Sequence, residues 1–203
     1  MDNISSNLLK RCVNEFSKLP GIGKKTALRL SIHLLKQKPE YAEALGNSII
    51  DMKKNIKFCK KCHNIAEGEL CDICANPKRK HNQICIVENI QDVLFIENTL
   101  QYSGTYHILN GVISPMEGVS PTDLNIETLV ERVKSGEIDE LILALPTTIE
   151  GDTTNFYLYK KLAPYINKVT TIARGVAVGD EIEYIDEVTL GRSIINRIPY
   201  QNA

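Results

Sequence analysis

The spacing of apolar residues along the chain changes near residue 80. Before that point apolar residues recur every three to four positions, which predicts helices over residues 8–19 and 24–35. After it, short apolar runs alternate with helix-like spacing. We expect strands at 84–87, 106–109, 140–145 and 169–172, and helices at 92–101, 126–134 and 154–162. This order is typical of an α/β fold, in which helices cover both faces of a parallel sheet.

The last part of the chain has a weaker pattern. Residues 181–185 alternate between polar and apolar, as an exposed strand does, and residues 189–197 can form a short helix. A segment with so little apolar surface must pack on something else. Its own α/β domain is the candidate partner that the pattern alone suggests.

Composition indicates a cytoplasmic protein with a packed core. Of the 203 residues, 43% are hydrophobic, yet no apolar run approaches the ~18 residues that cross a bilayer. The first residues lack the basic and then apolar pattern of a secretory signal. We therefore expect no membrane association and a reducing compartment, in which thiols stay free.

Four of the six cysteines follow the pattern C-x2-C-x8-C-x2-C. They are Cys59, Cys62, Cys71 and Cys74. Disulfides are an alternative for six cysteines, but in a reducing compartment this spacing favours a metal. Short Cys-x-x-Cys loops suit Zn²⁺ better than an iron–sulfur cluster. Four thiolates leave no position open for water, so the zinc is expected to be structural.

Three other residues of metal-binding type are not expected to be zinc ligands. His63 follows Cys62 directly, but four thiolates already complete the coordination shell. Cys12 and Cys85 lie in apolar surroundings, which predicts core positions for both.

Charge divides the chain into two parts of opposite sign. Residues 1–80 contain sixteen Lys and Arg against eight Asp and Glu, whereas the remainder contains eight against seventeen. The basic part is what a protein that meets phosphate groups needs, although an ordinary lysine-rich surface has the same composition.

The turn between the first two predicted helices is rich in glycine and is followed by cations. Gly21 and Gly23 permit a tight turn with positive φ, and the amides at such a helix start bind phosphate oxygens. Lys24, Lys25 and Arg29 follow, and the last two share a helix face. The pattern is that of a helix-hairpin-helix, with a plain interhelix turn as the alternative. A P-loop is excluded, because its first glycine is absent.

Acidic residues follow two of the predicted strands. Glu88 comes directly after one strand, and Glu150 and Asp152 follow another. Functional groups gather at the carboxyl ends of parallel strands, where three carboxylates can hold Mg²⁺. Strand-end acids also serve as helix caps or lie in solvated loops. The segment offers no Ser-His-Asp arrangement and no evident general base.

The order of these features closely resembles the RecR family of bacterial recombination mediators over essentially the full length. The matching stretches are LPGIG at 19–23, CDIC at 71–74, ICIVE at 84–88, GVISP at 111–115 and EYIDEVTL at 183–190. The resemblance implies a helix-hairpin-helix region at 1–55 and a four-cysteine zinc module at 56–80. It further implies a Toprim domain at 81–175 and a Walker-B-like, oligomer-forming segment at 176–203.

The resemblance also implies a function. Members of this family form ring-shaped tetramers that encircle single- or double-stranded DNA with little sequence preference. With RecO, and in many bacteria RecF, they help to load RecA onto gapped single strands at the nucleoid, without being enzymes. The DNA contacts of the family carry over to Lys25 and Arg29, and its partner-binding acids to Glu150 and Asp152.

The chain departs from the family pattern in one loop. Before Glu150 the family usually has Ala-Thr-Asn-Pro-Thr, whereas residues 144–148 read Ala-Leu-Pro-Thr-Thr. Asp152 stands where glutamate is commoner, which keeps the charge. This altered loop positions Glu150 and Asp152, so the resemblance predicts the role of these acids less closely than it predicts the rest of the chain.

Two functions of different classes remain after these arguments. The first is a non-enzymatic DNA clamp and adaptor, in which the basic part binds DNA and the acidic part binds proteins. The second is an Mg²⁺-dependent nuclease or other phosphoryl-transfer enzyme, because the same fold serves both kinds of protein.

Overall fold

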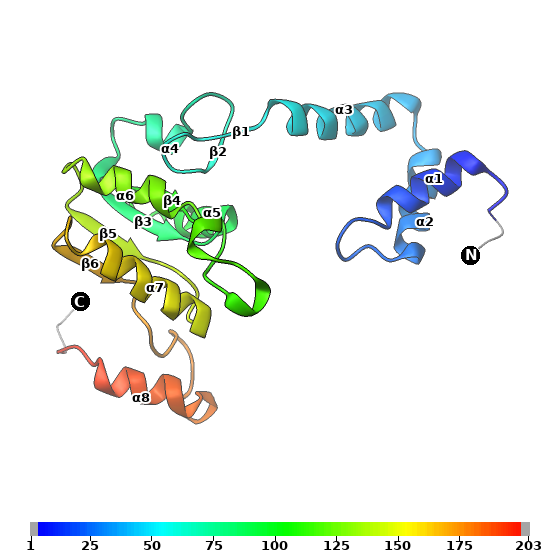
Figure 1. Ribbon diagram of the computed structural model, residues 1–203. Helices are drawn as coiled ribbons and strands as arrows, with labels where there is room; N and C mark the ends of the chain where they lie inside the picture. Colours follow the sequence, from blue (N-terminus) through cyan, green and yellow to red (C-terminus); the bar gives the residue numbers. More distant parts are fainter. Residues whose placement is uncertain (1–3, 200–203) are drawn as a thin grey trace. The chain divides into compact units, whose positions relative to one another are not determined.

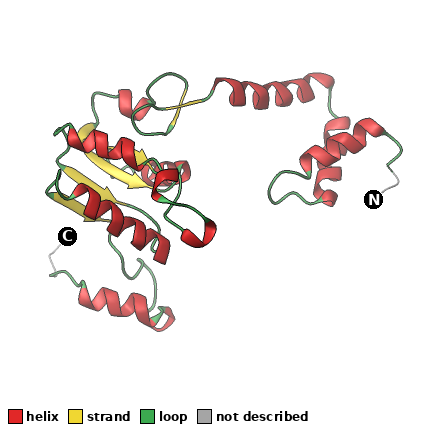
Figure 2. Ribbon diagram, in the orientation of Figure 1, coloured by secondary structure: helices red, strands yellow, loops and turns green. Residues whose placement is uncertain are grey.

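The computed structural model describes residues 4–199, so the outermost residues of the predicted 1–55 and 176–203 regions lie outside it. The chain divides into two compact units, Met1–Ile56 and Lys57–Ala203, which are described separately (Figure 1). The first contains only helices, and the second contains all the strands of the described residues (Figure 2). None of the described helices is long and apolar enough to cross a membrane.

The first unit consists of three helices, α1 (Asn7–Phe16), α2 (Lys24–Leu35) and α3 (Pro39–Asn55). The Ser6 hydroxyl accepts a hydrogen bond from the backbone N–H of Leu9 and caps α1. The predicted extension of α1 to residue 19 is wrong, because residues 18 and 19 form tighter three-residue backbone bonds. Helix α3 was not predicted. A proline at its first position favours its start, and it has no buried residue.

A small metal-binding module begins the second unit. Strands β1 (Lys57–Phe58) and β2 (Ile65–Ala66) form an antiparallel hairpin, and the short helix α4 (Asp72–Ala75) follows. Each of these elements is too short to build a core of apolar side chains, so the module depends on the four cysteines that it brings together.

The rest of the second unit is a parallel sheet, as the sequence predicted. Its strands are β3 (Lys80–Val87), β4 (Gly104–Ile108), β5 (Glu140–Leu143) and β6 (Lys168–Thr171), in the spatial order β4-β3-β5-β6. The chain leaves the central strand β3 toward β4 and returns to pair β5 on the other side. The carboxyl ends of β3 and β5 therefore flank the point where the strand order reverses, where ligands commonly bind.

Helices cover both faces of this sheet, which confirms the α/β fold class. Helix α5 (Ile90–Asn98) packs over Cys85, Val87 and Tyr106, so the predicted core position of Cys85 is confirmed. On the opposite face, α6 (Ile126–Lys134) and α7 (Ile149–Leu162) bury the larger of the two apolar clusters. By contrast, Cys12 in the first unit is only half-buried.

Helix α7 begins five residues earlier than the sequence predicted. Thr148 caps it, since its hydroxyl accepts a hydrogen bond from the Gly151 backbone N–H at 3.1 Å. A Cβ atom at Gly151 would lie only 1.9 Å from the Pro146 carbonyl oxygen. Glycine therefore lets the helix start against this loop, and Glu150 and Asp152 lie in the first helical turn rather than in a loop.

The C-terminal segment contains a 3-10 helix, η3 (Ile182–Tyr184), and α8 (Glu187–Ile195). The predicted exposed strand at 181–185 is wrong. The backbone N–H of Tyr184 bonds to the Glu181 carbonyl, and no neighbouring strand pairs with this segment in residues 4–199. The predicted helix is present, and Asp186 caps it through the Thr189 backbone N–H at 2.9 Å.

Candidate functional site

The four predicted ligand cysteines meet in the small module. The β1–β2 hairpin supplies Cys59 and Cys62, and the start of α4 supplies Cys71 and Cys74. All four are buried and free of disulfides, and their sulfurs lie within 4.8 Å of one another. Zn–S bonds of ~2.3 Å in a tetrahedron place sulfurs ~3.8 Å apart. The 3.5 Å between two of the sulfurs is close to that spacing, so the group fits a zinc ion.

The chemistry of this cysteine group also suits a cation. Hydrogen bonds from Cys62 and then Cys74 lower the pKa of the Cys71 thiol. This favours one thiolate, at Cys71, whereas hydrogen bonding with Cys71 and burial raise the pKa of the Cys62 thiol, whose proton a zinc ion must displace. In the described part of the chain this is the single group of three or more Cys, His, Asp or Glu whose ligand atoms come this close.

His63 is not in the group of ligand atoms that meet, and it joins the module to the sheet. It has a positive φ of 65°, and its Nε2 lies 2.8 Å from the Thr128 hydroxyl on α6. The backbone N–H of Ile108, at the end of β4, donates to the Cys62 carbonyl at 3.0 Å. Ile73 contributes to the apolar clusters of both the module and the sheet. The module is therefore docked on the sheet by polar and apolar contacts together.

Arg132 lies beneath this junction. Its guanidinium donates to the Tyr106 carbonyl at 2.8 Å and contacts the His107 Nδ1 at 3.2 Å. Burial lowers the pKa of Arg132, against the opposing effect of the nearby cysteines. Burial and the Arg132 charge lower the pKa of His107 to about 3, so this imidazole is neutral. One cation thus stands near a cysteine group that becomes strongly negative when it is deprotonated.

A second polar cluster holds the end of the module. Arg79 forms an ion pair with Glu97 on α5, and it donates to the Tyr102 carbonyl at 3.1 Å. The Tyr106 hydroxyl donates to the same Glu97 carboxylate at 2.6 Å. Since both charged side chains are largely buried, removing one of them would leave the other charge without its partner, which costs more than breaking a surface ion pair.

The hairpin turn of the first unit is formed largely as predicted. Gly21 has a positive φ of 77° and so needs glycine, but Gly23 has a φ of −79°. The expectation of a positive φ at both glycines is therefore wrong for Gly23, which caps α2. Lys24, Lys25 and Arg29 are exposed, and none of them forms an ion pair within residues 4–199. They are free to contact phosphate groups.

The predicted acidic site forms only in part. Glu88 and Glu150 line one cavity of about 310 Å³, together with Glu117, which the sequence pattern did not single out. Burial and then the neighbouring Asp92 raise the pKa of Glu88. Asp152 does not line this cavity, because it pairs with Arg174 at 2.7 Å. The expected convergence of three carboxylates is wrong for Asp152, which the turn of α7 directs elsewhere.

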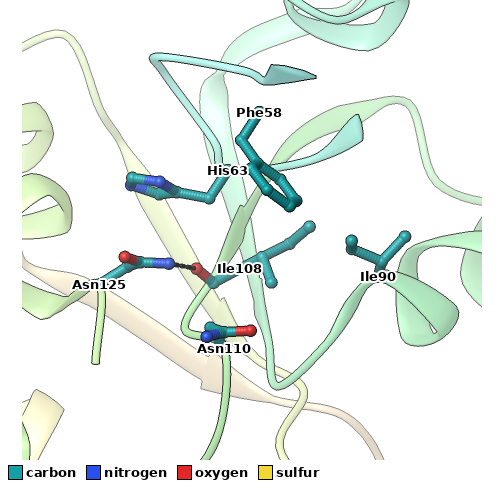
Figure 3. A pocket seen from close by; sticks show the side chains of 6 residues that line it. All are labelled: Phe58, His63, Ile90, Ile108, Asn110 and Asn125. Carbon is teal, nitrogen blue, oxygen red and sulfur yellow. Dashed lines mark hydrogen bonds between the residues drawn. The ribbon is translucent and has the colours of Figure 1, made fainter. Parts of the chain in front are cut away.

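A further cavity of about 210 Å³ lies where the metal module meets the sheet (Figure 3). Its lining residues are Phe58, His63, Ile90, Ile108, Asn110 and Asn125. Sequence reasoning missed it, because its residues come from four separated stretches of the chain. The available signal was an aromatic residue between lysines, at Lys57-Phe58 and Lys60-Lys61.

Models of four protein families match consecutive parts of the chain. Three are described as RecR, helix-hairpin-helix (residues 9–53), Toprim domain (82–173) and RecR, C-terminal (175–198). The fourth is the RecR zinc finger domain with four cysteines (56–76). This zinc-finger match covers the four cysteines of the module, in agreement with zinc as the metal.

Curated proteins named Recombination protein RecR are similar over nearly the full length. That of Bacteroides thetaiotaomicron is 62% identical over 192 residues, covering 95% of this chain and 94% of that protein. That of Flavobacterium johnsoniae is 57% identical over 197 residues, covering 97% and 96%. That of Porphyromonas gingivalis is 53% identical over 199 residues, covering 98% and 96%.

Proposed function

The chain belongs to the RecR family of recombination proteins, and from that premise we propose that it is a non-enzymatic DNA-binding mediator of recombinational repair. Its helix-hairpin-helix would hold DNA, its zinc would be structural, and its Toprim domain would bind partner proteins. The finer parts of the proposal are a ring-shaped tetramer, work with RecO and RecF, and RecA loading on gapped single strands. The proposed location is the cytoplasm, at the nucleoid.

The observation that carries this proposal is the hairpin turn with its free cations. Gly21 and Gly23 shape the start of α2, and Lys24, Lys25 and Arg29 are exposed beside it. Amides at a helix start and unpaired cations together suit the DNA backbone and carry no base specificity.

Charge-matched variants test the hairpin directly. We expect Lys25→Ala with Arg29→Ala to weaken binding to any DNA sequence and to make the salt dependence shallower. Each lost phosphate contact removes ~0.9 from the slope of log K against log salt, so the expected change is about 2. Lys36→Ala with Lys38→Ala removes the same charge from exposed positions of the same unit and serves as the control. Equal losses in the two double variants would exclude the hairpin as the DNA site.

One observation favours a second function. Glu88, Glu117 and Glu150 line a common cavity at the carboxyl edge of the sheet, and carboxylates there can hold Mg²⁺. A metal-dependent nuclease is the alternative that follows. Incubating the protein with Mg²⁺ and supercoiled or single-stranded DNA distinguishes the two, since the mediator leaves both substrates intact. Cleavage that Glu150→Gln abolishes would replace the mediator proposal with the nuclease.

A further inference from the structure

The cavity between the metal module and the sheet has apolar and amide groups that the helix-hairpin-helix turn of the first unit lacks. Its volume of about 210 Å³ is below the ~300–1,000 Å³ of pockets for drug-sized ligands, so it suits one small flat group. Phe58 stands at its side, with 64% of its surface exposed. Ile90 and Ile108 supply apolar surface within it (Figure 3). A flat apolar ligand is therefore favoured on that side.

Polar groups occupy other parts of the same cavity. The Asn125 side-chain amide donates to the Ile108 carbonyl at 3.0 Å, which leaves its oxygen as an acceptor (Figure 3). The Asn110 carboxamide has no hydrogen-bond partner among residues 4–199. The two amides therefore offer both a donor and acceptors, which is what the edge of a nucleobase requires.

The backbone around the cavity is held in an uncommon conformation. Among the described residues three non-glycine residues have positive φ, and two of them, His63 at 65° and Asn110 at 66°, line this cavity. The backbone N–H groups of Asn110 and Gly111 both donate to the Glu88 carbonyl, at 2.8 and 3.2 Å. The amide of Asn110 is thus presented by a fixed turn, as is common at binding sites.

The sequence around Phe58 carries positive charge, which suits a phosphodiester chain. Lys57 precedes Phe58 directly, and Lys60 and Lys61 follow within three residues. Lys60 pairs with Glu69 at the surface, whereas Lys57 and Lys61 have no ion pair in the described part of the chain. Cations beside an exposed aromatic ring are the usual combination in single-strand binding sites.

We propose that this cavity receives one unpaired base of single-stranded DNA, which stacks on Phe58 and bonds to Asn110 and Asn125. The proposal rests on the proposed function, because it assumes a protein that the hairpin already brings to DNA. It adds a single-strand preference that phosphate contacts alone do not provide, since a base inside a duplex is not free to enter the cavity.

Fluorescence anisotropy with three labelled DNAs tests this: an oligothymidylate, a duplex of equal length, and an oligomer of equal length whose bases are replaced by abasic sites. We expect Phe58→Ala to weaken oligothymidylate binding about five- to a hundredfold, as loss of one stacked base does, and to leave the other two unchanged. Asn110→Gly removes the amide, tolerates the positive φ, and should have a smaller effect of the same selectivity. Phe58→Trp should retain binding.

Matched controls separate this effect from misfolding. Phe95→Ala removes a phenylalanine that is 69% exposed on α5 and does not line the cavity, and it should change nothing. Zinc content and thermal melting check that each variant is folded. As a direct readout, DNA containing 5-iododeoxyuridine should photocross-link to the peptide that carries Phe58.

The outcomes distinguish failure of the base-binding site from failure of the proposed mediator function. If Lys25→Ala with Arg29→Ala weakens binding but Phe58→Ala does not, the base-binding proposal is overturned and the mediator proposal stands. Equal weakening of Phe58→Ala on abasic and base-containing strands also overturns it, since the residue then acts without a base. If the folded wild-type protein binds none of the DNAs, both proposals fail.

Discussion

The two units of the chain differ in how much of their apolar surface they bury. In the described part of the first unit the buried residues are Val13, Ala27 and Ser31, and α3 contributes none. The second unit has an apolar cluster on each face of its sheet, in addition to the buried cysteines. Burial of apolar surface is the main source of stability. The first unit therefore has a small hydrophobic core beneath its predicted DNA-contacting residues. The second unit contributes most of the free energy of unfolding.

Loss of the metal is expected to have the largest effect on the stability of the second unit. Zinc binding in small modules contributes on the order of 10 kcal/mol to their folding, so we expect Cys71→Ser to lose stoichiometric zinc and to lower the melting temperature of the second unit. Helical signal from the first unit should remain. Zinc analysis and thermal melting followed by circular dichroism measure both effects. Cys12→Ser, at a half-buried cysteine outside the group, is the control. A Cys71→Ser protein with full zinc and unchanged melting would contradict the assignment.

Adding one methyl group to each unit sharpens the same comparison. In the second unit, Gly151→Ala forces a Cβ against the Pro146 carbonyl, and we expect it to cost about 1–3 kcal/mol in the free energy of unfolding. In the first, Gly46→Ala meets no atom within 4 Å in the middle of α3 and should stabilise by about 0.5–1 kcal/mol. Urea denaturation compares the two variants. Similar effects of the two substitutions would contradict the close approach at Gly151.

Acid titration tests the buried ion pair of the second unit. Burial alone would raise the pKa of Glu97, but hydrogen bonds from Arg79 and Tyr106 lower it overall. A carboxyl whose pKa is lowered on folding adds stability above its unfolded pKa, and this is lost as the pH falls through the folded pKa. Glu97→Gln should therefore cost about 1.5–3 kcal/mol near pH 7 and progressively less in acid. Urea denaturation at stepped pH measures this difference.

The exposed pair of the metal module supplies the control for this titration. Glu69→Gln removes the partner of Lys60 at the surface and should change the free energy of unfolding by less than ~1 kcal/mol at every pH. A loss for Glu97→Gln that does not depend on pH would show that its charge is not what stabilises the junction.

The smallest expected effect on stability lies at the hairpin. Lys25 and Arg29 are exposed and unpaired in residues 4–199, so their joint replacement by alanine should change the free energy of unfolding by less than ~0.5 kcal/mol. DNA affinity should nevertheless fall. Measuring melting and DNA binding on the same samples checks this. A destabilised double variant would mean that these cations support the fold and would weaken the contrast between the units.

Features encoded in a few neighbouring residues were predictable from the sequence. The cysteine spacing, the glycine of the hairpin turn and the apolar runs of the strands each depend on local geometry. The start of α7 was missed because Thr148, two residues after a proline, reads as loop until its hydroxyl is seen to cap the helix. The same shift directs Asp152 to Arg174, a partner 22 positions away that no spacing rule connects to it.

What the sequence could not supply was the meeting of distant segments. The cavity beside Phe58 requires the end of β4 and the start of α6 to lie against the metal module. Glu117 likewise joins Glu88 only after the chain has passed through β4. Hydrophobic periodicity indicates which residues are buried, but it does not indicate which loops meet at the edge of a sheet.

The docking of the metal module also has a consequence for the order of events during synthesis. All four cysteines lie within sixteen residues, so they can capture zinc as soon as that stretch leaves the ribosome. Ile108 and Thr128, which bond to the module, are made later, because the chain emerges from its N-terminus. We expect the module to have folded around zinc before β4 is synthesised and packs against it. Low zinc concentration would then impair the folding of the nascent chain, rather than remove the metal from protein that has already folded.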